Sequence, residues 1–221
     1  KFRFPLQSQD TLSIIEYFYA ICNVSGWFFK SRKRKYYLLH KFKRLILYIF
    51  VHSYEKGMVV MATIALFSGQ GSQYEKMGLD LVQQDAALEE IFEVASEVLG
   101  FDLYAVIADG DAQTLAHTIY AQPAIMATSL VCLEAAKKRG FTYDAVAGHS
   151  LGEYAAMVAA GMLSLEDGFK VIKARSEAMD AAAKAADGAM CAILKLAPAE
   201  VERICSETEG YVIPANYNSS V

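Results

Sequence analysis

The sequence predicts an α/β fold in which a parallel sheet is wrapped by helices. Short apolar runs rich in β-branched residues alternate along the chain with longer segments whose apolar residues recur at helical spacing. This alternation is typical of strands connected by helices, which produces a parallel sheet. The chain has 221 residues, of which 54% are hydrophobic and 21% charged, so it is long enough to bury a substantial core.

Composition divides the chain near residue 57. Residues 1–57 hold 11 of the 21 Lys and Arg residues but only 3 of the 25 Asp and Glu residues. Segments that differ this much rarely form one folding unit, so we expect a leader at 1–57 that is non-native or poorly ordered and packs little against the rest. Residues 11–35 contain an apolar run followed by a basic cluster, which leaves a membrane anchor as the alternative.

The elements expected after the leader follow from apolar spacing and from boundary residues. Residues 63–67 are predicted to form a buried strand that ends in a glycine-rich loop. One helix is expected to begin near Pro123, and Ser164 with Asp167 fits the N-terminal cap of another. The expected helices are 79–99, 102–108, 118–140, 151–163, 165–185 and 197–210, and the further expected strands are 143–150, 189–196 and the start of 211–221.

The sequence Gly148-His149-Ser150-Leu151-Gly152 has the pattern GxSxG between an expected strand and an expected helix. That order is typical of a sharp turn that displays a nucleophilic serine, with glycines where side chains would collide. Ser150 would then lie at the N-terminus of the helix, where the N–H group of Leu151 can stabilise an oxyanion. An ordinary glycine-rich turn is the alternative.

Arg175 lies on the apolar face of the expected helix 165–185, because Ile172 and Met179 flank it at helical spacing. A guanidinium on an inward face requires an anion, and its fork of donors fits a carboxylate bidentately. The anion is either a substrate carboxylate or an internal Asp or Glu, and the sequence leaves both open.

The loop 67–73 follows a strand but lacks the residues of a P-loop or of a dinucleotide-binding turn. Two glycines flank Gln70, so its backbone N–H group could turn toward Ser150 as a second oxyanion donor. A simple tight turn is the alternative.

A serine nucleophile needs a base, which is most often a histidine. The histidines of the chain are His40, His52, His117 and His149, and none follows Ser150. If His149 continues the strand, its side chain leaves from the opposite face, and His117 is expected at the surface. We therefore expect the base to lie outside this chain.

Several stretches together resemble the first part of malonyl-CoA:acyl-carrier-protein transacylases and of the related acyltransferase domains of fatty-acid and polyketide synthases. They are residues 67–73, 121–129, 148–156, the helix that carries Arg175, 187–194 and 215–220, in the order of that family. The resemblance extends over residues 61–221. It implies a large hydrolase-like subdomain at 58–187 and the start of a small ferredoxin-like subdomain at 188–221.

The resemblance implies a ping-pong transfer. Ser150 would take malonyl from coenzyme A as an ester and pass it to the phosphopantetheine thiol of acyl carrier protein. Arg175 would bind the malonyl carboxylate, and the N–H groups of Gln70 and Leu151 would form the oxyanion hole. No metal or other cofactor is implied. The other residues that the resemblance places at the substrate site are Gln122, His149 and Asn218.

Members of this family continue beyond the part that matches residues 61–221, and the resemblance implies that their catalytic histidine lies there. We therefore expect this chain to be a fragment of a cytoplasmic transacylase that is monomeric when complete. A membrane or nucleic-acid partner is not expected, and the net charge of −4 agrees. The alternatives are a piece of a polyketide synthase acyltransferase domain, an inactive remnant, and a general serine esterase, which Arg175 disfavours.

Overall fold

A computed structural model of the chain describes residues 46–55, 58–186 and 188–217. Contacts divide these residues into two units, of which the larger contains 46–55 and 58–186 and the smaller contains 188–217. Most of the expected leader lies outside the described residues, and so does Asn218.

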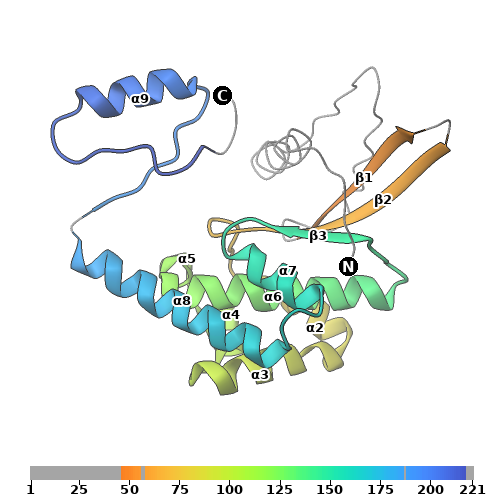
Figure 1. Cartoon of the computed structure of the whole chain (residues 1–221). Helices are drawn as coiled ribbons and strands as arrows, with labels where there is room; N and C mark the ends of the chain where they lie inside the picture. Colours follow the sequence, from red (N-terminus) through yellow and green to blue (C-terminus); the bar gives the residue numbers. More distant parts are fainter. Residues whose placement is uncertain (1–45, 56–57, 187, 218–221) are drawn as a thin grey trace. The chain divides into compact units, whose positions relative to one another are not determined.

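The described part of the larger unit contains a sheet of three strands in the order β1-β2-β3 (Figure 1). β1 (Ile46–Glu55) pairs antiparallel with β2 (Met58–Phe67), whereas β3 (Ala145–Gly148) pairs parallel with β2. The register sets Phe67 opposite Gly148, so β2 and β3 end side by side. A parallel pair connected through helices confirms the predicted α/β fold.

Part of the segment expected to stand apart joins this sheet. The sequence predicted a strand at 63–67, but β2 begins at Met58, and the backbone of residues 46–55 pairs with its whole length. Two physical reasons account for the difference. The run 46–51 is rich in β-branched and aromatic residues, and antiparallel pairing satisfies backbone groups that an edge strand leaves open.

Helices fill the chain between β2 and β3 and continue after β3. They are α2 (Leu79–Gln84), a 3-10 helix (Ala86–Leu88), α3 (Glu90–Leu99), α4 (Leu103–Asp109), α5 (Ala112–Ala116), α6 (Thr118–Lys138), α7 (Gly152–Ala159) and α8 (Leu165–Ala185). Figure 1 shows α6, α7 and α8 gathered on one face of the sheet, where they pack against one another. The core lies between β2 and these helices, and its largest buried side chains include Phe67, Phe92 and Phe169.

The central helix, α6, begins at Thr118, so the prediction of a start near Pro123 is wrong. Pro123 lies inside the helix, where it removes one backbone hydrogen bond. Tertiary packing holds the helix nevertheless, because Pro123 and the residues after it are buried against neighbouring elements. By length and composition alone α6 could cross a membrane, but 78% of its apolar window is buried in the protein, as in a core helix.

The expected helix 79–99 is interrupted at Asp85. Asp85 has an extended backbone, and its side chain accepts a hydrogen bond from the N–H group of Ala87. A short acidic side chain bonds nearby backbone groups in place of a helical turn, so α2 ends there and α3 starts again at Glu90. The apolar spacing continues across the break, which is why it predicted one helix.

The smaller unit contains α9 (Pro198–Glu207), which begins with proline as predicted. The strands predicted at 189–196 and from Tyr211 are wrong, since the described residues 188–217 contain no strand. A strand needs a hydrogen-bonded neighbour, and the described residues of this unit provide none. The apolar side chains of Met190, Leu194 and Tyr211 are exposed.

The cap of α8 gives a stability prediction. Ser164 accepts a hydrogen bond from the N–H group of Asp167 at 3.0 Å. Ser164→Ala should lower the free energy of unfolding by about 1 kcal/mol, because one helix-end donor loses its partner. Urea denaturation measures the change, with Glu177→Ala on the exposed face of α8 as the control. Equal effects of the two substitutions would contradict the role of the cap.

Candidate active site

A strand, a sharp turn and a helix display Ser150. β3 ends at Gly148, α7 begins at Gly152, and Ser150 has φ +53° in the turn between them. Residues with a side chain rarely adopt this left-handed conformation, and such strain concentrates at functional sites. Ser150 is exposed, so the turn presents its hydroxyl at the surface.

The two glycines of the turn allow backbones to touch. A Cβ atom on Gly148 would lie 2.2 Å from the carbonyl of Gly152, and one on Gly152 would lie 2.3 Å from the carbonyl oxygen of Phe67. The N–H group of His149 donates to that same Phe67 oxygen at 3.0 Å. The end of β2, the turn and the start of α7 are therefore in direct contact, as a nucleophile turn requires.

Two backbone N–H groups near Ser150 are open. In the described part of the chain, the N–H groups of Leu151 and Gln70 have no hydrogen-bond acceptor. Leu151 is the N-cap residue of α7, so the helix dipole adds to its positive character. A backbone N–H group without an acceptor at a helix N-terminus can donate to an anion.

The loop that carries Gln70 lies against the serine turn. A Cβ atom on Gly69 would lie 2.6 Å from Nδ1 of His149, which shows how close the loop and the turn are. The hydroxyl of Ser72 donates to the carbonyl oxygen of Gly69 at 2.8 Å and also contacts the hydroxyl of Ser68 at 2.9 Å. These bonds fix the loop that carries Gln70, whose N–H group was predicted from the sequence as the second oxyanion donor.

Arg175 on α8 points at the serine. Its Nη2 donates to Ser150 Oγ at 2.9 Å, and its Nη1 donates to Gln122 Oε1 at 2.5 Å. Among the described residues no carboxylate pairs with Arg175. The internal ion pair that the sequence left open is therefore absent from the described chain, and the guanidinium is available to an external anion.

Three further side chains surround Arg175. Gln122 on α6 is fully buried, and its Nε2 donates to Sδ of Met179, which lies one turn after Arg175 on α8. Cζ of Arg175 lies over the ring of Tyr154, 5.6 Å from its centroid. Neither Tyr154 nor Met179 was predicted from the sequence as a site residue. The available signal was helical spacing, four residues from Ser150 and from Arg175 respectively.

The structure places two of the histidines near or before the helices of the site. The hydrogen bond at Ser150 Oγ comes from Arg175. His117 is exposed, as expected, and precedes α6. Partial burial lowers the pKa of His149, and the nearby carboxylate of Glu153 opposes this effect.

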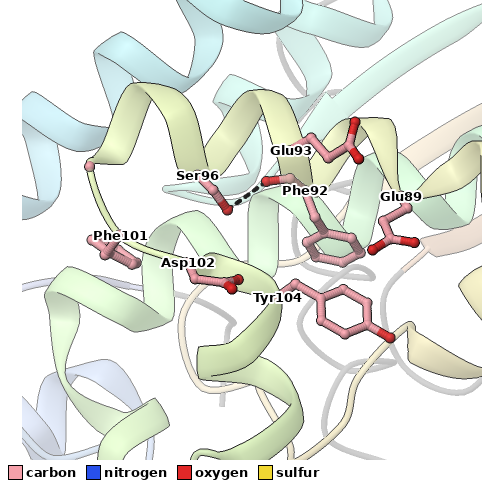
Figure 2. A pocket seen from close by; sticks show the side chains of 8 residues that line it. Glu89, Phe92, Glu93, Ser96, Phe101, Asp102 and Tyr104 are labelled. Atoms are coloured by element: carbon pink, nitrogen blue, oxygen red, sulfur yellow. Dashed lines mark hydrogen bonds between the residues drawn. The ribbon is translucent and has the colours of Figure 1, made fainter.

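A hollow of about 440 Å³ lies at α3 and the start of α4, and Figure 2 shows the side chains that line it. It contains none of the residues grouped around Ser150. Its lining residues are Glu89, Phe92, Glu93, Ser96, Gly100, Phe101, Asp102 and Tyr104. No group of three or more His, Cys, Asp or Glu side chains that could hold a metal ion occurs among the residues that the structure describes.

Comparison with known sequences identifies a family and close relatives. A family described as acyl transferase domain matches residues 65–221. The malonyl CoA-acyl carrier protein transacylase of Bacillus subtilis is 43% identical over 162 residues, which are 72% of this chain and 51% of that protein. The chain thus spans about half the length of the curated relatives it matches.

Solved structures agree with the sequence comparison. An acyl carrier protein S-malonyltransferase from Vibrio cholerae is 39% identical with a TM-score of 0.58, covering 65% of this chain and 47% of that one. A malonyl-transacylase in complex with the acyl-carrier protein of a type II polyketide synthase is 33% identical. Its TM-score is 0.58, and the match covers 65% of this chain and 47% of that one.

The contact at Gly152 predicts a strong effect of one methyl group. Gly152→Ala should lower the free energy of unfolding by about 3 kcal/mol, because the added Cβ meets backbone that cannot move away easily. Urea denaturation of Gly188→Ala is the control, since a Cβ there meets nothing within 4 Å. A Gly152→Ala protein as stable as the control would contradict the close contact.

Burial of His149 predicts a pH dependence. Its pKa in the folded chain lies below the usual 6.5, so the unfolded chain binds the proton more tightly. The free energy of unfolding should therefore fall as the pH decreases from 6.5 toward the lowered pKa. The contribution of His149 to this free energy should be fully present above pH 6.5. His149→Gln should remove this contribution in urea denaturation at a series of pH values. The exposed His117→Gln is the control, and parallel profiles of His149→Gln and the unmodified chain would refute the prediction.

Proposed function

The chain belongs to the acyl transferase domain family, and on that premise we propose that it carries the nucleophile and the carboxylate-binding residue of a malonyl-CoA:acyl-carrier-protein transacylase of fatty-acid synthesis. The hydrogen bond of 2.9 Å between Arg175 and Ser150 Oγ carries the proposal. It joins a serine on a nucleophile turn to a cation without a carboxylate partner in the described chain. An acyl group that bears its own carboxylate offers an acyl carbon to Ser150 and an anion to Arg175.

In the first half of the reaction, Ser150 Oγ attacks the thioester carbonyl carbon of malonyl-CoA. The serine proton passes to a base, and the carbonyl oxygen becomes an oxyanion that accepts hydrogen bonds from the N–H groups of Leu151 and Gln70. Collapse of this intermediate re-forms the carbonyl and breaks the C–S bond. Coenzyme A leaves as a thiolate that takes up the proton, and malonyl remains as an ester on Ser150.

Arg175 selects the acyl group in this proposal. Its two terminal nitrogens donate to Gln122 and Ser150 when no substrate is bound. A malonyl carboxylate attracts the guanidinium more strongly than two neutral oxygens do, so the guanidinium donates its hydrogen bonds to the carboxylate instead. This exchange also releases the Ser150 oxygen for attack. An acetyl group offers no such partner.

In the second half, the phosphopantetheine thiol of acyl carrier protein attacks the ester carbonyl. A base takes the thiol proton, the same N–H groups hold the oxyanion, and Ser150 leaves with a proton. The product is malonyl thioester on the carrier. We assign the base to a histidine outside the described residues, as the family resemblance implies, and the transfer requires no metal ion.

The remaining assignments follow the resemblance. Gln122 and His149 are proposed to line the substrate site together with Asn218, and the burial of Gln122 beside Arg175 supports its place there. Acyl carrier protein is the proposed partner and the cytoplasm the proposed location. The relative solved with a polyketide acyl-carrier protein makes a polyketide carrier the second candidate.

Mass spectrometry of the Ser150 peptide tests the proposal after incubation with malonyl-CoA or acetyl-CoA. The chain should acquire a malonyl adduct on Ser150 faster than an acetyl adduct, and Ser150→Ala should acquire neither. Arg175→Met should reduce the malonyl-to-acetyl ratio about tenfold or more, because a charged hydrogen-bond donor is lost. Added acyl carrier protein with its phosphopantetheine should remove the adduct.

Two outcomes would contradict the proposal. Equal adducts from both thioesters on the unmodified chain would refute Arg175 as the carboxylate-binding residue. A complete lack of adducts on the unmodified chain would contradict acylation of Ser150 in this chain.

A further inference from the structure

Two hydrogen bonds and an aromatic contact hold Arg175. Its terminal nitrogens donate to Gln122 and Ser150, and its Cζ lies over the ring of Tyr154, 5.6 Å from the centroid. An arginine side chain loses considerable rotamer entropy when it is fixed, and no ion pair holds it in the described chain. The aromatic contact therefore adds to the two hydrogen bonds that fix the guanidinium before substrate arrives.

Tyr154 is built into the serine turn. It lies on α7, and its N–H group donates to the carbonyl oxygen of Leu151 at 3.2 Å. Its side chain is half-buried and packs against the core, so the ring is anchored. The hydroxyl has no hydrogen-bond partner among the described residues, so the contact with Arg175 depends on the ring.

The two kinds of contact respond differently to substrate. A carboxylate binds a guanidinium bidentately in the plane of its nitrogens, so it displaces partners at the edge. The contact between Cζ and the ring of Tyr154 uses none of these nitrogen donors, so a carboxylate need not displace it. Tyr154 can therefore keep Arg175 in place while the guanidinium exchanges its hydrogen bond to Ser150 for hydrogen bonds to the incoming carboxylate.

We propose that Tyr154 is a positioning residue that holds the Arg175 guanidinium for carboxylate recognition and thereby sharpens the discrimination between malonyl and uncharged acyl groups. This inference rests on the proposed function for its consequence on selectivity. Its structural part concerns only the placement of Arg175 in the unliganded chain.

NMR of the unliganded chain tests the placement. A side chain over an aromatic face has its proton resonances shifted upfield by the ring, so the Arg175 side chain should show this shift. Tyr154→Phe should keep the shift and Tyr154→Leu should abolish it. Tyr104→Leu is the matched control, because Tyr104 is also half-buried but packs against Phe92 instead. An Arg175 shift unchanged in Tyr154→Leu would overturn the proposal.

The malonyl-to-acetyl ratio of Ser150 adducts tests the consequence. Tyr154→Leu should lower this ratio about fivefold, while Tyr154→Phe and Tyr104→Leu should keep it. An unchanged ratio in Tyr154→Leu, or an equal fall in Tyr104→Leu, would overturn the role in selectivity. If the unmodified chain forms no adduct, the proposed function fails for this chain, and the NMR shift still decides whether Tyr154 places Arg175.

Discussion

The close contact between the end of β2 and the start of α7 is the constraint on which the site depends. Backbone atoms of Phe67 and Gly152 approach so closely that no side chain fits at position 152. The contact fixes the start of α7, directly after Ser150 and Leu151. Because α7 also carries Tyr154, the same contact sets the ring over which Arg175 lies. Ser150, Leu151 and Arg175 are thus placed relative to one backbone junction.

Electrostatics explains why an arginine lies beside Ser150. A partly buried guanidinium is costly to desolvate, and here it has only neutral oxygens and an aromatic face to compensate within the described chain. The unliganded site is consequently under-satisfied. A ligand carboxylate would supply the missing interaction, so the proposed affinity for a negatively charged acyl group would arise from this deficit in the free protein as well as from contacts in the complex.

The sequence predicted those features that depend on local chemistry. The strand, turn and helix around Ser150, the cap at Ser164 and the inward position of Arg175 all follow from residue type and spacing. The predictions from the sequence were wrong where tertiary packing or the lack of a partner strand determines the structure. Pro123 is held inside α6 by burial, and residues 189–196 form no strand because the described residues 188–217 provide no partner strand. Helical spacing relates Tyr154 to Ser150, but the contact of its ring with Arg175 depends on how α7 and α8 pack.

The left-handed backbone of Ser150 has a consequence for stability. At φ +53° a residue with a side chain is strained, whereas glycine adopts this conformation freely. Replacement of the serine by glycine would thus relieve backbone strain while it removes the hydroxyl, so stability and the proposed chemistry oppose each other at this one position. A Ser150→Gly chain that is more stable than the unmodified chain would show how much folding free energy the serine costs.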